Sequence, residues 1–85
     1  MTVATRAIRL VLSLRQAGIV DTRVLSALER VPREAFVPRA LQHQAYENMA
    51  IPIGHGQTLS QPLVVARMTQ ALEANDRHKV LEIGT

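Results

Sequence analysis

Lys79-Val80-Leu81-Glu82-Ile83-Gly84-Thr85 is the stretch that decides the predicted fold. Its Val-Leu-x-Ile core followed by glycine is typical of a strand buried inside a parallel sheet. In folds that bind nucleotide-type cofactors, ligands lie beyond the carboxyl ends of such strands. Residues 1–78 supply too little strand to pair with this segment. We therefore predict an incomplete α/β domain, in which residues 63–85 contribute one helix and the first strand of a sheet.

Residues 1–48 form the predicted helical part. The apolar positions between Val3 and Leu14 recur at helical spacing, and Gly18 follows where a left-handed cap would end that helix. Asp21 offers a side-chain oxygen to begin a second helix. This helix must stop near Val31, because a proline disfavours helical geometry in the residue before it.

Two aromatic residues are expected to anchor residues 31–48. Residues 31–38 are bracketed by prolines, which leaves room for one helical turn with Phe36 facing inward. Residues 39–48 are predicted to form a short helix that Tyr46 holds in place.

Residues 49–62 are predicted to form a hairpin and a loop. Residues 51–53 and 57–59 can form two extended pieces around Gly54-His55-Gly56. Ser60 is expected to cap a helix with Pro62 in its first turn, running to about residue 74. One face of that helix carries Val65, Met68, Thr69 and Leu72.

The same loop allows two interpretations. Free N–H groups at the helix start, with the Thr58 and Ser60 hydroxyls, would suit a carboxylate ligand. The simpler interpretation is a glycine hairpin followed by an ordinary serine cap. Residue types alone favour the simpler one and leave both open.

Composition excludes several classes of protein. The chain has 85 residues, 47% of them hydrophobic and 20% charged, which suits one small globular domain and not two. It has no cysteine, so a disulfide framework and a thiolate metal site are excluded. No apolar run approaches the roughly 20 residues that cross a bilayer. We expect a cytoplasmic protein with no membrane partner.

Metal and hydrolase chemistry are also disfavoured. His43, His55 and His78 have no further ligands at the spacing that zinc sites use, so we predict no metal. Ser60 lacks the histidine and acid of a recognisable nucleophile elbow.

Several segments in order resemble the protein-L-isoaspartate O-methyltransferases. The resemblance covers nearly the whole chain and is dense from Val31 onward. It is carried by residues 31–38 (VPREAFVP), 45–48 (AYEN), 51–62 (IPIGHGQTLSQP), 65–69 (VARMT) and 80–85 (VLEIGT). Leu59 stands where isoleucine is usual.

The resemblance implies a Rossmann-like fold that binds S-adenosylmethionine, with an N-terminal helical part over the site. It implies that Ser60 is the active-site residue and that Gln57, Thr58 and Leu59 form the loop over the cofactor. Gly84 and Thr85 match the opening of the glycine-rich cofactor motif, whose remainder this sequence lacks. The expected activity is methylation of isoaspartyl carboxyl groups in damaged proteins, with the 85-residue fragment inactive alone.

An alternative function rests on the charge distribution. Residues 1–39 carry seven arginines against three acidic residues, a balance of +4, while the whole chain has a net charge of +3. A helix-turn-helix made by residues 3–31 could present Arg23 and Arg30 to nucleic acid. No aromatic stacking platform or Lys/Arg run accompanies them, so a solvated face is the favoured interpretation and no nucleic-acid partner is expected.

Overall fold

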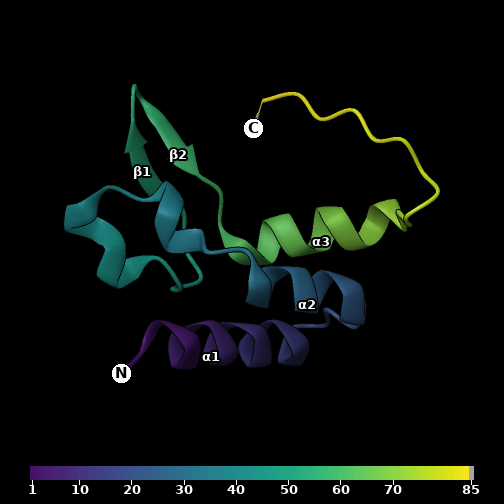
Figure 1. The fold of residues 1–85 in the computed structure, drawn as a ribbon, viewed down its shortest axis with the longest axis horizontal. Coiled ribbons are helices and arrows are strands. Elements are labelled where there is room, and N and C mark those ends of the chain that lie inside the picture. The colour runs from purple at the N-terminus through teal and green to yellow at the C-terminus, as the bar shows by residue number, and fades with distance from the viewer. Residues whose placement is uncertain (85) are drawn as a thin grey trace.

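The computed structural model describes residues 1–84, and three α-helices make up most of it. Helix α2 lies between α1 and α3, and the hairpin stands beside the short helical turns (Figure 1). After α3 the chain runs back above that helix as residues 73–84 (Figure 1). In order, the elements are α1 (Val3–Gln16), α2 (Thr22–Arg30), the 3-10 turns η1 (Arg33–Phe36) and η2 (Arg39–Gln44), β1 (Ile51–Gly54), β2 (Gln57–Leu59) and α3 (Pro62–Leu72).

The first two helices begin and end much as the sequence predicts. Gly18 follows α1 with a φ of +106°, a left-handed conformation that glycine adopts without steric cost. The Asp21 side chain accepts a hydrogen bond from the Arg23 amide at 2.9 Å and caps α2, as predicted. Helix α2 ends at Arg30, two residues before Pro32.

The core consists of two clusters that Tyr46 joins. The first lies among the three α-helices and contains Leu10, Leu14, Ile19, Val24, Leu25 and Ala66. The second lies under the hairpin and contains Val37, Ala45 and Ile51. Tyr46 is half-buried and packs against both clusters, which confirms its predicted role as an anchor.

The predicted hairpin is present. Strands β1 and β2 pair antiparallel with Ile51 opposite Leu59 and Pro52 opposite Thr58. The turn places His55 at a φ of +56°, an uncommon conformation for a residue with a Cβ. The buried Ile51 anchors the hairpin to the second cluster. The turn of the hairpin points away from the α-helices (Figure 1).

One predicted apolar contact is wrong. Phe36 does not face inward, and 58% of it is exposed. The α3 side chains predicted to share one face are exposed as well, including 69% of Met68. The α3 side chains that are buried are Pro62 and Ala66, because a small alanine lets α3 pack closely against the other helices.

The predicted strand in residues 79–84 does not form. These residues have no regular secondary structure, and 85% of Leu81 is exposed. Backbone groups of a strand need a neighbouring strand as partner. The only sheet in the described residues is the β1–β2 hairpin, which lies elsewhere. Residues 1–84 combine helices with this small sheet and contain no Rossmann-like sheet. No helix in residues 1–84 combines the length and apolarity needed to span a bilayer.

Candidate functional site

The predicted active-site serine lies in the link between the hairpin and helix α3. Strand β2 ends at Leu59 and α3 begins at Pro62, so Ser60 belongs to neither element. Ser60 is exposed, and within residues 1–84 its hydroxyl makes no hydrogen bond. The hydroxyl is therefore available to a ligand.

Ser60 does not cap α3, which corrects the sequence prediction. The N-cap residue is Gln61, and its side chain makes no cap hydrogen bond. In the first turn, the Leu63 amide donates instead to the Asn48 Oδ1 at 3.0 Å. The Gln61 Nε2 in turn donates to the Asn48 carbonyl oxygen at 3.3 Å. This cap comes from a residue fifteen positions from Leu63, too distant for a local sequence pattern to show.

The Arg33 side chain donates hydrogen bonds to backbone carbonyl oxygens of this link and of two other segments. Its guanidinium donates to the Ser60 carbonyl oxygen at 3.0 Å, the Met49 carbonyl oxygen at 3.3 Å and the Ala45 carbonyl oxygen at 2.5 Å. Burial lowers the pKa of the guanidinium, and the nearby Tyr46 acts in the opposite direction. Sequence reasoning missed this residue, although it lies within the motif at residues 31–38.

Tyr46 and Glu34 hold the Arg33 segment in place. The Tyr46 hydroxyl accepts from the Arg33 amide at 3.2 Å and donates to the Glu34 carboxylate. Burial raises the pKa of the Tyr46 hydroxyl above its usual 10.0, and the hydrogen bond to Glu34 raises it further. The contribution of the raised Tyr46 pKa to the free energy of unfolding is fully present below pH 10.0. It is lost as the pH rises through the pKa that Tyr46 has in the folded protein.

An apolar groove of about 370 Å³ lies next to the link, between α2 and α3. Leu59 and Arg33 line it on one side, and Phe36, Val65 and Thr69 also contribute. Of the predicted cofactor residues within residues 1–84, Leu59 alone lines this groove. Gln57 and Thr58 are exposed on β2.

The described residues do not enclose a cofactor around Gly84. Gly84 has a φ of +91°, and no atom lies within 4 Å of where its Cβ would stand. A cradle that a Cβ would fill is therefore not formed around Gly84. Thr85, the last predicted cofactor residue, lies outside the described residues.

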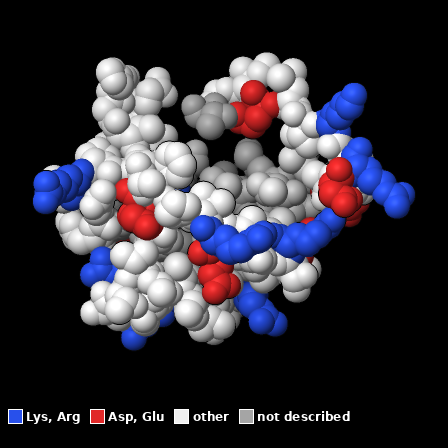
Figure 2. Space-filling model, in the orientation of Figure 1, with Lys and Arg blue, Asp and Glu red and all other residues white. Residues whose placement is uncertain are grey.

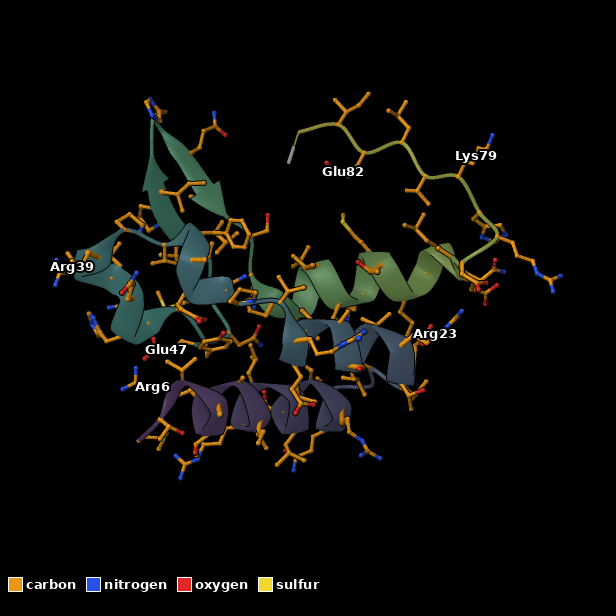
Figure 3. The ribbon with its side chains drawn as sticks, in the orientation of Figure 1. Arg6, Arg23, Arg39, Glu47, Lys79 and Glu82 are labelled. Atoms are coloured by element: carbon orange, nitrogen blue, oxygen red, sulfur yellow. The ribbon has the colours of Figure 1, made fainter. Side chains whose placement is uncertain are left out.

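A second hollow of about 360 Å³ lies beside the N-terminal half of α1. Arg6 and Arg9 line it together with His43, Tyr46 and Glu47. Figure 3 shows Arg6 and Glu47 on facing segments, so a negative side chain shares the hollow with the positive ones. Its charges are mixed.

Basic and acidic side chains are interspersed on the face in Figure 2. A band of Lys and Arg atoms crosses the middle of that face, and Asp and Glu side chains lie next to it. Arg23, one of the two arginines of the nucleic-acid alternative, pairs with Asp21 at 3.4 Å. Within residues 1–84, no three His, Asp or Glu side chains gather as metal ligands would.

Comparison with known proteins identifies the family. Residues 5–85 match the model of the family described as protein-L-isoaspartate(D-aspartate) O-methyltransferase. The chain belongs to this family. Protein-L-isoaspartate O-methyltransferases are methyltransferases by name, and the family assignment gives no support to the nucleic-acid alternative.

Individual bacterial members of this family are closely similar to the chain. The protein-L-isoaspartate O-methyltransferase of Rhodospirillum rubrum is 66% identical over all 85 residues. Those of Rhodospirillum centenum and Yersinia enterocolitica are 60% and 62% identical over 85 and 76 residues. The chain spans 39%, 38% and 36% of the lengths of these three relatives.

Proposed function

We propose that this chain supplies the substrate-orienting part of an S-adenosylmethionine-dependent methyltransferase that acts on L-isoaspartyl carboxyl groups of damaged proteins. The observation that carries the proposal is the exposed, unbonded Ser60 hydroxyl within a chain of this family. Residues 1–85 would form one portion of a larger domain. The Rossmann-like sheet and the site for S-adenosylmethionine would require the length that the relatives have and this chain does not span.

The proposed role of Ser60 is to donate a hydrogen bond to the substrate carboxylate. A carboxyl group of this kind has a pKa near 4 and is already ionised at pH 7, so no general base is needed. The protein then acts mainly by placing the carboxylate, and correct placement can contribute roughly 7 to 11 kcal/mol. Ser60 is an orienting donor in this scheme and not a covalent nucleophile.

The neighbouring residues have proposed roles that depend on their positions. Gln57 and Thr58 are exposed on β2, where they can contact a peptide or a cofactor that approaches the hairpin. Leu59 lines the apolar groove and packs against the second cluster. Gly84 and Thr85 are proposed to join the cofactor site only when further strands flank their segment.

The test uses a chimera in which these 85 residues replace the matching 85 residues of the Rhodospirillum rubrum relative. Transfer of labelled methyl groups from S-adenosylmethionine to an isoaspartyl peptide is measured. We expect the chimera to be active and the 85-residue chain alone to be inactive. An inactive but folded chimera would contradict the proposed function.

Replacing Ser60 tests its role. In the chimera, Ser60→Ala should lower kcat/KM about ten- to hundredfold, as expected for loss of a hydrogen bond to a charged group. S-adenosylhomocysteine binding should stay nearly unchanged. Ser60→Thr, which keeps a hydroxyl, should recover part of the loss. Ser26→Ala, at an exposed serine of α2, is the matched control and should change little.

A further inference from the structure

Arg33 gathers three segments that are distant in the sequence. Its carbonyl partners Ala45, Met49 and Ser60 lie 12, 16 and 27 positions away. They belong to the end of η2, the segment before β1 and the link before α3. One side chain therefore contacts all three of these segments.

The chemistry of arginine suits this task. A guanidinium is planar and carries five N–H donors in a fixed fork, so it can hold several carbonyl oxygens at set directions. Within the described residues Arg33 forms no salt bridge, and its neighbour Glu34 is engaged by Tyr46. The three carbonyl oxygens are thus the polar partners of its guanidinium among residues 1–84, and they replace the water that burial removes.

The contact with Ser60 is the one that bears on function. Ser60 stands outside β2 and α3, so neither the strand ladder nor the helix hydrogen bonds fix its backbone. The Arg33 hydrogen bond to its carbonyl oxygen at 3.0 Å does so instead. The direction of the Ser60 hydroxyl depends on the orientation of that backbone.

We propose that Arg33 is a positioning residue that aims the Ser60 hydroxyl at the substrate carboxylate by holding the Ser60 carbonyl oxygen. This inference rests on the proposed function. It differs from a purely structural role, in which Arg33 would stabilise the fold and influence the reaction only through the fraction of folded protein.

The experiment is a double-mutant cycle in the chimera, with the parent, Arg33→Lys, Ser60→Ala and the double variant. The measured quantities are kcat and KM for an isoaspartyl peptide, with rates corrected for the folded fraction from circular dichroism. Lysine keeps the charge but lacks the fork, so one ammonium cannot reproduce all three contacts. Arg39→Lys, at an exposed arginine of η2, is the matched control.

We expect Arg33→Lys to lower kcat about ten- to hundredfold when Ser60 is present, because a small misplacement of a reacting group has an effect of this size. In the Ser60→Ala background the same change should lower kcat less than about twofold, since effects that act through one group are not additive. Arg33→Met serves as a second variant with no donor, and its loss should be at least as large.

Two outcomes overturn the inference in different ways. An equal fall in kcat for Arg33→Lys with and without Ser60 means that Arg33 does not act through the serine, while the proposed function stands. Unchanged activity of Ser60→Ala removes the proposed role of the serine and the role of Arg33 with it.

Discussion

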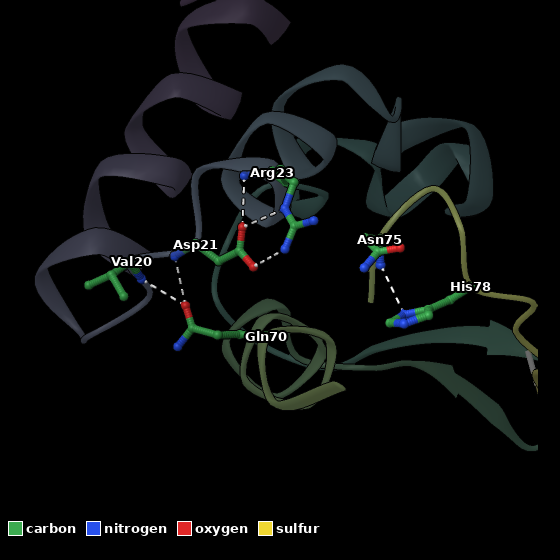
Figure 4. Close-up of polar contacts among 6 residues, drawn as sticks. All are labelled: Val20, Asp21, Arg23, Gln70, Asn75 and His78. Atoms are coloured by element: carbon green, nitrogen blue, oxygen red, sulfur yellow. Dashed lines mark hydrogen bonds and ion pairs between the residues drawn. The ribbon is translucent and has the colours of Figure 1, made fainter. Parts of the chain in front are cut away.

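Gln70 connects α3 to the turn between the first two helices, and its removal gives a sharp test of how these helices are joined. Its Oε1 accepts hydrogen bonds from the Val20 and Asp21 amides, each at 2.8 Å (Figure 4). The two amides precede α2, and 50 and 49 positions separate them from Gln70. We predict that Gln70→Met, which keeps the length of the side chain, destabilises the protein.

The expected magnitude comes from the two lost bonds. Each hydrogen bond contributes a net of about 0.5 to 1.5 kcal/mol to the free energy of unfolding, which sets an upper range of about 1 to 3 kcal/mol. The Val20 amide belongs to an exposed residue, so water can replace its partner. Asp21 is half-buried, and its amide is less easily rehydrated. We therefore expect a loss of about 1 to 2 kcal/mol.

Urea denaturation of the 85-residue chain, followed by circular dichroism at the helical band, measures this loss. The midpoint should fall while the slope with urea stays unchanged, because the surface exposed on unfolding is nearly the same. Gln16→Met, at an exposed glutamine of α1, is the matched control. Methionine and glutamine have similar helix propensities, so the control isolates the two hydrogen bonds.

Gln70→Glu sharpens the comparison. The carboxylate keeps an acceptor oxygen at the same distance along the side chain, so this variant should be more stable than Gln70→Met. If Gln70→Met stays within about 0.5 kcal/mol of the parent, the usual range for surface substitutions, the reasoning is refuted.

Two further predictions concern the support of the candidate site. Asn48→Ala removes the cap of α3 and should lower the free energy of unfolding by about 1 kcal/mol. Asn48→Asp keeps the acceptor oxygen, so its free energy of unfolding should fall much less. Equal losses of stability for the two variants in urea denaturation would contradict the role of Asn48 as a cap. Because the pKa of Tyr46 is raised, the free energy of unfolding should fall as the pH rises from 10.0, and Tyr46→Phe should remove that part of the decline. A parallel decline in both proteins, measured by denaturation at several alkaline pH values, would show that Tyr46 is not its source.

Much of the local structure could be predicted from the sequence because its causes are local. Asp21 caps the helix that follows it directly, and Pro32 limits how far that helix extends. Gly54 and Gly56 permit the tight hairpin turn, where both have positive φ. Tyr46 anchors its segment as predicted, and the motifs at residues 31–38 and 51–62 indicate the family that the comparison identifies.

Residues 79–84 show where a sequence pattern is insufficient. Their Val-Leu-x-Ile pattern is typical of a buried strand, but a strand requires a neighbour, and the described part of the chain offers none. The burial of α3 side chains could not be predicted for a related reason. Which side of a helix becomes buried depends on the elements that pack against it, and the small side chain of Ala66 allows the closest packing.

The sequence by itself indicated the first two helices, the hairpin and the family, and the resemblance to that family pointed to Ser60 as the candidate active-site residue. It did so because capping, turn formation and motif order depend on residues close together in the chain. Only the tertiary structure decided which groups surround Ser60. Asn48 in place of Ser60 caps α3, and Arg33 binds the Ser60 carbonyl oxygen, because folding brings together residues that are 15 and 27 positions apart.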